Sequence, residues 1–377
     1  MHIGLLTSEY PYEGSPRSGG IGTSIKNLAV ELVKCGVRVS VFAHSQDKDE
    51  VRTEEDVEIH LIKSRKYSIF TFYKYRKYVQ KYVNQQIHRS EIDVVEAPDW
   101  TGFTAFMKFD APLVIRFHGS DAYFCKLENR RQKIKNFIFE WLALQGADAF
   151  VSPTNYAGKV TSEIFNLQKE FTRIHYGISL SKFENQQPEN FENGLILYIG
   201  TVIRKKGVLE LPSIMKKVSA RFPRAKLVLI GADSPDISTG SSSTWKMIEA
   251  EFDGNAKYLG KVPYVEVQQY LRNAHVCVFP TFAETLGMVT IEAMAMQKPV
   301  VNSNYGWAQE IITDGESGFL VDPADHDLFS ERIFSLLSDP ERCKTIGKNA
   351  RERVDERFNI EKTVYQNIEL YKSLSKS

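Results

Sequence analysis

The chain has 377 residues, more than one domain usually holds, and so predicts two domains of about 150–200 residues each. Apolar residues make up 42% and charged residues 25%, which is ordinary for a soluble globular protein. The 48 Lys and Arg against 47 Asp and Glu give a net charge of +1, which excludes a nucleic-acid binder that acts through bulk charge. No apolar run approaches the roughly 20 residues of a membrane-spanning helix, so we expect a cytoplasmic protein, soluble or peripheral on the membrane's inner face.

Short apolar runs rich in β-branched residues alternate with amphipathic segments along the whole chain. In the first half they predict strands at 2–8, 37–43, 57–62, 93–97, 112–117 and 149–153. In the second half they predict strands at 194–200, 225–231, 274–280, 298–301 and 317–322. This alternation is typical of parallel sheets with crossover helices. The predicted fold class is α/β, with two Rossmann-like domains that face each other across a cleft.

The domain boundaries are predicted from composition. The segment 179–193 is polar and poor in aliphatic residues, as expected of a linker. It divides a first domain, 1–178, from a second domain, 194–359. The end of the chain, 360–377, has a helical pattern, and we expect this helix to return to the first domain.

Polar or glycine-rich segments follow several predicted strands. Ligands of open α/β sheets bind beyond the carboxyl ends of the strands, so these segments are the candidate sites. There are four of them: 17–24, which contains Gly20 and Gly22; 118–121, which begins with His118; 200–207, which contains Gly200, Thr201, Arg204 and Lys206; and 281–287, which contains Glu284. Any one of them can be an ordinary turn, but four at the same edge of two sheets indicate binding.

The helical segment 285–297 is apolar on nearly every side, and Glu292 is its only charged residue. A buried carboxylate without partners is costly, so Glu292 is either paired, protonated or in contact with a ligand such as a ribose diol. The amino end of this helix, near Gly287, suits a diphosphate, with Lys206 and Arg204 as countercharges. The structural alternatives are a Glu satisfied within the protein and a solvated basic turn.

These residues carry a resemblance to retaining glycosyltransferase family 4. The segment FAETLGMVTIEAMAMQKPVV (282–301) resembles the family's Glu-x7-Glu pair and the run that follows it. Other family-like segments follow in order along nearly the whole chain: GGIG (19–22), HGSD (118–121), HYGIS (175–179), GTVIRKKG (200–207), LIGA (229–232) and DGESGFLVDPAD (314–325). The resemblance implies the GT-B fold and transfer of a hexose or hexosamine, with retention, from a nucleotide-diphosphate sugar.

The resemblance also implies roles for individual residues. Glu292 would hold the ribose hydroxyls, Glu284 would contact hydroxyls of the transferred sugar, and Lys206 would neutralise the diphosphate. His118 would hydrogen-bond a sugar hydroxyl near the reacting carbon. The catalytic candidates are therefore His118, Glu284, Lys206 and Arg204. The donor-binding candidates are Gly20, Gly22, Gly200, Thr201, Gly231, Lys261, Val262, Thr285, Leu286, Gly287 and Glu292, among which Gly231, Lys261 and Val262 would border the base.

The reaction implied by the family is a front-face displacement, in which the acceptor hydroxyl attacks from the side on which the nucleotide diphosphate leaves. The donor, with UDP favoured over GDP, is a co-substrate, and neither a cofactor nor a metal is expected. Thr201 departs from the family pattern, which often has Arg there, and Arg204 would then take over the phosphate contact. The segment 304–307 stands where many relatives have a paired glycine, which leaves the identity of the sugar open.

The segment 63–89 is the candidate acceptor or membrane surface. It has eight Lys or Arg, seven aromatic residues and no Asp or Glu. A basic aromatic helix suits the interface of an anionic membrane; the alternative is a solvated helix whose aromatic residues pack on the core. The surface candidates are Lys74, Arg76 and Lys77, with Arg130 and Arg131 from a second basic cluster. The membrane interpretation implies a glycan or lipid-linked acceptor, as in surface polysaccharide or glycolipid synthesis, and nucleic acid is not an expected partner.

Other functions remain open at this point. They are a transferase with a soluble small-molecule acceptor, a phosphorylase or epimerase of the same fold, and a catalytically weak transferase-like binding subunit. Retention of Glu284, Glu292, Lys206 and His118 argues against a degenerate subunit, whereas Thr201 is a small point in its favour.

Overall fold

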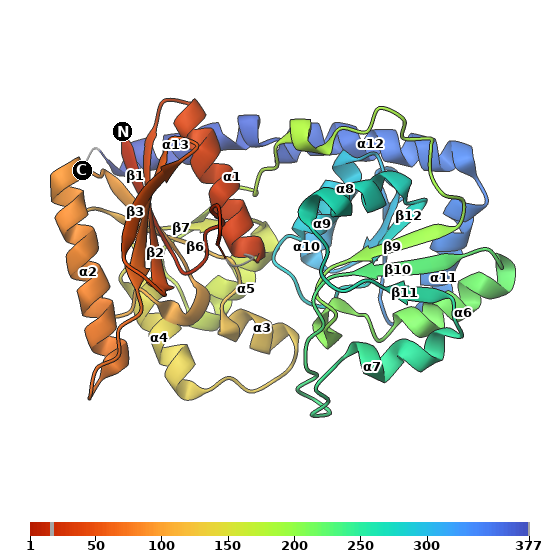
Figure 1. The fold of residues 1–377 in the computed structure, drawn as a ribbon, viewed down its shortest axis with the longest axis horizontal. Helices are drawn as coiled ribbons and strands as arrows, with labels where there is room; N and C mark the ends of the chain where they lie inside the picture. Colours follow the sequence, from red (N-terminus) through yellow and green to blue (C-terminus); the bar gives the residue numbers. More distant parts are fainter. Residues whose placement is uncertain (16–18, 376–377) are drawn as a thin grey trace. The chain divides into compact units, whose positions relative to one another are not determined.

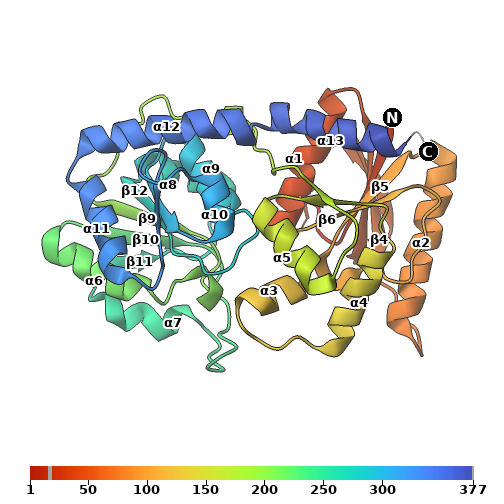
Figure 2. The same cartoon turned by 180° about the vertical axis from the view of Figure 1, so that it is seen from behind.

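The computed structural model describes residues 1–15 and 19–375. The chain forms two compact units, of which unit 1 comprises Met1–Ser179 with Phe358–Ser377 and unit 2 comprises Leu180–Arg357. Each unit contains one sheet and its own set of helices (Figures 1 and 2). Part of the predicted glycine-rich loop 17–24 and the end of the predicted helix 360–377 lie outside the described residues.

The sheet of unit 1 has the strand order β3-β4-β2-β1-β5-β6-β7-β8. Its strands are β1 (His2–Thr7), β2 (Arg38–Gln46), β3 (Glu50–Glu54), β4 (Val57–Lys63), β5 (Val94–Pro98), β6 (Leu113–Arg116), β7 (Ala149–Ser152) and β8 (Phe171–Arg173). Every pair is parallel except β3 with β4. The chain winds outward from β1 on both sides, so the topological switch point, where ligands of such sheets bind, lies between β1 and β5.

Apolar clusters bury both faces of this sheet. One cluster joins the sheet to α1 (Gly20–Lys34) and α13 (Ile360–Leu374), through side chains such as Leu28 and Val364. The other involves α2 (Thr71–Ser90), with Val79 and Val83 fully buried. Further helices of unit 1 are η1 (Trp100–Gly102), α3 (Asp121–Leu127), α4 (Ile134–Gln145) and α5 (Asn155–Phe165). The predicted return of the C-terminal helix to the first domain is confirmed, because α13 belongs to unit 1.

The sheet of unit 2 is wholly parallel, with the order β11-β10-β9-β12-β13-β14. Its strands are β9 (Leu195–Ile199), β10 (Lys226–Ile230), β11 (Ala256–Tyr258), β12 (Val276–Phe279), β13 (Val300–Ser303) and β14 (Phe319–Val321). Its helices are η2 (Leu180–Phe183), η3 (Arg204–Lys206), α6 (Leu211–Arg221), α7 (Trp245–Ile248), η4 (Glu249–Phe252), α8 (Tyr264–Asn273), α9 (Met288–Ala295), α10 (Gly306–Ile311), α11 (His326–Leu337) and α12 (Pro340–Phe358). Here the switch point lies between β9 and β12.

Every strand predicted from the sequence is present, with ends shifted by a few residues, and the two-domain α/β prediction is confirmed. The strands β3, β8 and β11 were not predicted, because they are short and carry few buried apolar residues. From Leu180 onward, the predicted linker 179–193 is grouped with unit 2. Within it Phe183 is buried and Asn185 donates a hydrogen bond to the Met296 carbonyl. None of the described helices has the length and apolar character needed to cross a membrane.

Candidate functional site

Three loops of unit 2 are hydrogen-bonded to one another at the carboxyl edge of the sheet. The amide of Gly200, after β9, donates to the Ile230 carbonyl over 2.9 Å. The amide of Gly231, after β10, donates to the Gly260 carbonyl, also over 2.9 Å. Lys261 and Val262 follow directly on this third loop, with Lys261 exposed and Val262 half-buried. The predicted donor-binding residues of these loops are therefore neighbours beside the switch point.

The loops after β9 and β12 are also joined. The amide of Phe282 donates to the Lys205 carbonyl over 2.9 Å. Gly207 has a φ of +68°, and a Cβ at this position would overlap the carbonyl oxygen of Pro280. Only glycine satisfies both conditions, so the sequence RKKG fixes how closely the basic loop approaches β12.

Lys206 and Glu284 form an ion pair between these two loops. Both side chains are about four-fifths buried, with 21% and 18% of their area exposed. Burial favours the neutral form of Glu284, but the Lys206 charge and hydrogen bond and the Thr285 amide, 3.1 Å away, outweigh it and lower the pKa of the carboxyl. The structure thus brings together two of the predicted catalytic residues as a charged pair at the switch point.

The helix α9 begins directly after this pair. Gly287 precedes it with a φ of +89°, a left-handed conformation that glycine adopts without strain. Thr285 and Leu286 are buried, and Glu292, at 6% exposure, is the only charged residue of α9. The amino end of a helix carries a positive partial charge, so this arrangement suits an anionic group near Gly287.

Arg204 and Lys206 were grouped as phosphate ligands from the sequence, but the structure separates them. The Arg204 guanidinium forms two hydrogen bonds, of 2.9 and 2.8 Å, with the carboxylate of Asp236, whose side chain is almost fully buried. These bonds hold the pKa of Asp236 well below its usual range. Thr201 is exposed, and its carbonyl accepts a hydrogen bond from the Tyr198 hydroxyl. Arg204 therefore holds the loop that carries Asp236, and Lys206 is the basic residue at the switch point.

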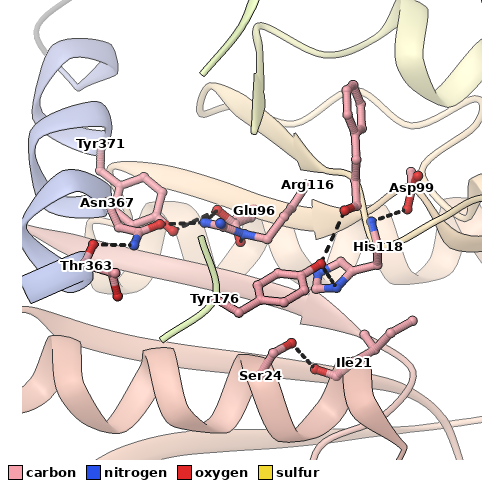
Figure 3. Close-up of polar contacts among 11 residues, drawn as sticks. Ile21, Ser24, Glu96, Asp99, Arg116, His118, Tyr176, Thr363, Asn367 and Tyr371 are labelled. Carbon is pink, nitrogen blue, oxygen red and sulfur yellow. Dashed lines mark hydrogen bonds and ion pairs between the residues drawn. The ribbon is translucent and has the colours of Figure 1, made fainter. Parts of the chain in front are cut away.

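In unit 1, His118 lies at the carboxyl end of β6 within a buried polar cluster (Figure 3). Its amide donates to Oδ1 of Asp99 over 2.8 Å. Its ring stacks on Tyr176, whose hydroxyl lies 2.7 Å from Nδ1. Burial, together with the nearby charge of Arg116, lowers the pKa of His118 to about 3, so the imidazole is neutral at physiological pH. Its Nδ1 is engaged with Tyr176, and Nε2 is the ring atom that a ligand could use.

An ion pair lies next to this histidine in the same cluster. Arg116 donates to both carboxylate oxygens of Glu96, over 2.6 and 2.9 Å, and both side chains are buried. Two residues of α13 complete the pair: the Asn367 amide oxygen accepts from Arg116, and the Tyr371 hydroxyl donates to Glu96 (Figure 3). A small hollow of about 20 Å³ lies beside this cluster, lined by Glu96, Arg116, His118, Tyr176 and Asn367 among others.

The other predicted site residues of unit 1 differ in burial and in their partners. Gly20 begins α1 and Gly22 is buried in its first turn, so both lie in the helix and not in the loop 17–24 predicted to precede it. Lys74 and Arg131 are exposed, and Arg130 is paired with Asp121 and Glu128.

Two basic residues of α2 are held by carbonyl groups. Lys77 donates to the Phe106 carbonyl. Arg76 departs from its expected surface position: it is 8% exposed and donates to carbonyls that include Phe103 at 3.0 Å. Burial lowers the pKa of Arg76 to about 10, and its guanidinium packs over the Phe139 ring, so it joins α2 to neighbouring segments instead of facing solvent.

Several residues of these clusters were not singled out from the sequence. Asp99 and Glu96 come from the strand segment DVVEAPD, where an acid among buried apolar residues is the same signal that identified Glu292. Tyr176 lies in HYGIS, which was noticed only as a family-like segment, and Asp236 gave no local signal. Within residues 1–15 and 19–375, no group of three or more His, Cys, Asp or Glu is arranged to hold a metal ion.

Comparison with known proteins places both halves of the chain in one group of enzymes. Residues 18–182 match the model described as Glycosyltransferase Family 4, and residues 181–353 match the model described as Glycosyl transferases group 1. An uncharacterized glycosyltransferase of Methanocaldococcus jannaschii is 26% identical over 385 residues, which covers 100% of this chain and 99% of that protein. A capsular polysaccharide biosynthesis glycosyltransferase of Staphylococcus aureus is 30% identical over 191 residues, which covers 48% of this chain and 49% of that protein.

Solved structures share the fold. Sucrose-phosphate synthase from Thermosynechococcus elongatus matches with a TM-score of 0.82 at 20% identity, over 99% of both chains. The Anabaena protein HepE, in complex with UDP and glucose, matches with a TM-score of 0.77 at 17% identity, over 99% of this chain and 100% of that chain. These likenesses identify the architecture as GT-B. With the two family models covering nearly the whole chain in order, the chain belongs to the GT-B glycosyltransferases, with a family 4 first domain and a group 1 second domain.

Proposed function

We propose that this glycosyltransferase moves a hexose or hexosamine, with retention, from a nucleotide-diphosphate sugar to a glycan or lipid-linked acceptor. The observation that carries the proposal is the Lys206–Glu284 pair at the switch point of unit 2, directly before the amino end of α9. A switch point with a helix amino terminus is where open α/β sheets bind nucleotide phosphates.

Each donor group has a matching residue in this arrangement. The Lys206 ammonium and the amino end of α9 bind the diphosphate, and the ribose hydroxyls donate to the Glu292 carboxylate. Glu284 accepts hydrogen bonds from hydroxyls of the sugar, and the loops with Gly231 and Lys261 border the base. We favour UDP over GDP, which agrees with the UDP and glucose bound by the structurally similar HepE.

In the proposed mechanism the acceptor hydroxyl attacks the anomeric carbon on the face from which the diphosphate departs. Its proton passes to a phosphate oxygen, so no protein base and no metal is required. The protein contributes positioning and stabilises the charge that develops on the leaving diphosphate, chiefly through Lys206. His118, which is neutral at physiological pH, hydrogen-bonds a sugar hydroxyl and does not act as a cationic acid.

The acceptor is proposed to be a growing glycan or a lipid-linked sugar in surface polysaccharide or glycolipid synthesis. The capsular polysaccharide relative and the exposed basic residues of unit 1, such as Lys74 and Arg131, support this choice. If instead the enzyme uses a soluble acceptor, transfer to free sugars will exceed transfer to lipid-linked ones. If the chain is a binding subunit, it will bind the donor without transfer to any acceptor.

The donor assignment can be tested with a panel of sugar nucleotides. Thermal stabilisation identifies the donor, and transfer rates are then measured for Lys206→Met, Glu284→Gln and the exposed control Lys216→Met. Loss of one charge-assisted contact removes about 1.5–3 kcal/mol, so kcat/KM falls about ten- to a hundredfold in the first two variants. Unchanged transfer in Lys206→Met and Glu284→Gln refutes the site assignment. Activity that is lost on treatment with EDTA and restored by Mg²⁺ refutes the metal-independent mechanism.

A further inference from the structure

Helix α4 of unit 1 buries its carboxylate and exposes apolar side chains, which is the reverse of an ordinary surface helix. Its only carboxylate, Glu140, is 1% exposed and accepts hydrogen bonds from the amides of Asp121 and Ala122. Three of its large apolar side chains face outward, with Ile134 77%, Ile138 45% and Trp141 42% exposed, while Leu144 is buried in the core. The spacing of four and three residues places these three on one face of the helix. A helix of a globular protein normally buries its apolar stripe and exposes its charges.

The exposed apolar surface continues from α4 to the start of α2. Phe72 of α2 lies against Phe139 of α4, with ring centroids 5.3 Å apart. Residues Ile69 and Phe70, just before α2, are 61% and 65% exposed. We call this surface the outer apolar patch; its exposed members are Ile69, Phe70, Phe72, Tyr73, Phe106, Ile134, Phe137, Ile138 and Trp141. The two helices that carry most of it can be followed in Figures 1 and 2.

Basic side chains surround the patch, whereas its acidic groups are turned inward or paired. Lys133 and Lys135 are exposed at the start of α4, and the Lys135 ammonium lies 5.2 Å from the centre of the Phe72 ring. Exposed Lys74 and Arg131 add positive charge on α2 and on the loop before α4. Segment 63–89 contains no Asp or Glu, and α4 contains only the inward-facing Glu140.

We infer that the outer apolar patch binds the surface of a bilayer that contains anionic lipids. In this arrangement α4 lies in the plane of the membrane, with Ile134, Ile138 and Trp141 among the acyl chains just below the headgroups. The surrounding lysines bind lipid phosphates, and the Trp141 indole occupies the interface where tryptophan is favoured. This inference deepens the proposed function, because it places a lipid-linked acceptor beside unit 1, but membrane binding can be measured without transfer activity.

A bilayer explains the patch better than a protein partner does. Exposed apolar side chains on one helix face, ringed by cations, match the amphipathic pattern of helices that lie on anionic membranes. Polybasic segments gain about 1 kcal/mol for each Lys or Arg near an anionic surface, and this gain disappears with added salt. A protein interface of this kind would instead need acidic residues on the partner and would not require lipid.

The experiment is sedimentation of the full chain with phosphatidylcholine vesicles, either neutral or containing phosphatidylglycerol. We expect binding to the anionic vesicles only, and we expect it to weaken as salt is raised. The variant Ile134→Ser/Ile138→Ser/Trp141→Ser should reduce vesicle binding at least about tenfold, since three apolar side chains no longer insert. The variant Lys133→Gln/Lys135→Gln should reduce it about tenfold or more.

The matched controls change the same chemistry elsewhere. Ile237→Ser/Val265→Ser removes two exposed apolar residues of unit 2, and Lys216→Gln/Lys226→Gln removes two exposed lysines there. Both controls should bind anionic vesicles like the wild type. Retention of donor-nucleotide binding, measured by thermal stabilisation, shows that each variant is folded. If the wild type itself does not bind a donor nucleotide, the proposed function is contradicted. The vesicle experiment still tests membrane binding in that case.

A spectroscopic readout identifies the inserted residue directly. Tryptophan emission of the wild type should shift to shorter wavelength on anionic vesicles, and Trp141→Phe should abolish most of that shift. Equal binding to neutral and anionic vesicles overturns the inference, and so does wild-type affinity in the α4 triple variant. Dimers in solution that dissociate in the triple variant, without vesicle binding by the wild type, would assign the patch to self-association instead.

Discussion

Burial shifts the pKa values of Asp99 and His118 in opposite directions, and in both groups it favours the neutral form. It raises the pKa of Asp99 to about 7, with a further contribution from Glu140, although the His118 amide favours the ionised form. It lowers the pKa of the His118 imidazole to about 3. The Asp99 carboxylate accepts a hydrogen bond from the His118 backbone amide, and the imidazole takes no part in it. The charge of Asp99 therefore changes near neutral pH, while the His118 ring stays neutral.

The Asp99 carboxyl predicts a pH dependence of stability. Its folded pKa, about 7, lies above the ordinary value near 4, so the folded state binds this proton more tightly than the unfolded state does. Its contribution to the free energy of unfolding is therefore complete below about pH 4 and is lost as the pH rises to about 7. Three pKa units correspond to at most roughly 4 kcal/mol.

Urea denaturation of wild type and Asp99→Asn at several pH values measures this effect. The stability of the wild type relative to the variant should fall between about pH 4 and 7 and then level off. The exposed control Asp47→Asn should show no such trend. A constant difference across the range would mean that Asp99 does not titrate there.

The Arg204–Asp236 pair predicts a second effect on stability, whose pH dependence is opposite to that of Asp99. Arg204→Gln leaves the Asp236 carboxylate buried without its cationic partner, which should cost about 1–2 kcal/mol at neutral pH, since Arg204 is partly exposed. The pKa of Asp236 is lowered in the folded wild type, so this cost should shrink as the pH falls below about 4. Arg204→Gln/Asp236→Asn should recover most of the stability. Donor affinity should fall less in Arg204→Gln than in Lys206→Met, because Asp236 already compensates the Arg204 charge.

At the scale of elements, short connections determine the geometry of the proposed donor site. The loop after β9 passes so close to β12 that the carbonyl of Pro280 occupies the space where residue 207 would carry a side chain. The ion pair of Lys206 and Glu284 depends on this approach, because each residue stands on one of the two loops. Helix α9 follows Glu284 within four residues, so the helix terminus and the charged pair are fixed together.

Gly207→Ala should therefore disrupt unit 2 far more than a comparable glycine substitution. The added methyl collides with the Pro280 carbonyl, and a φ of +68° adds strain of about 1–2 kcal/mol for alanine. Gly254, with a φ of +81° and open space around it, provides the control, because Gly254→Ala adds only the strain. Chemical denaturation should show a loss at least about 2 kcal/mol larger for Gly207→Ala, accompanied by weaker donor binding. Equal losses in the two variants would show that the loop can move away from β12.

At the scale of the whole molecule, the chain forms two doubly wound sheets, and its last helix, α13, packs in unit 1 with the first sheet. The return is held by a buried network as well as by apolar packing: Asn367 and Tyr371 of α13 bond to the Arg116–Glu96 pair. The side chains proposed to bind the diphosphate and the ribose, Lys206 and Glu292, belong in contrast to unit 2. The two units should therefore respond differently to the donor.

A nucleotide that binds unit 2 should stabilise that unit first. At a concentration of 100 times its dissociation constant it adds about 2.7 kcal/mol to the stability of the state that binds it. Hydrogen exchange followed by mass spectrometry should then show protection in segments 200–207 and 282–292 on addition of the donor nucleotide. Protection confined to segments of unit 1 would contradict the assignment of donor binding to unit 2.

The amino-acid sequence by itself determined the fold class and most of the strands, and it singled out the loops that we propose as the donor site. Those features are local: an apolar β-branched run, a glycine before a helix and a lone carboxylate in an apolar segment each reveal their role within about ten residues. Glu292 was singled out in this way, whereas the roles expected of Glu284 and Lys206 are implied by the family resemblance. The short strands β3, β8 and β11 were missed because few of their residues are buried.

Only the tertiary structure decided which charges are paired and which faces are exposed. Arg204 and Lys206 look alike in the sequence, and their separation depends on Asp236, which is 30 residues or more away along the chain. Arg76 and Lys74 are likewise similar neighbours, but one is buried under carbonyl groups and the other faces solvent. Helix α4 has the composition of a core helix, but it buries Glu140, Ala143 and Leu144 and leaves the face with Ile134 and Trp141 exposed. The physical reason is that burial and partnership depend on contacts between distant segments, whereas propensity and periodicity are properties of neighbouring residues.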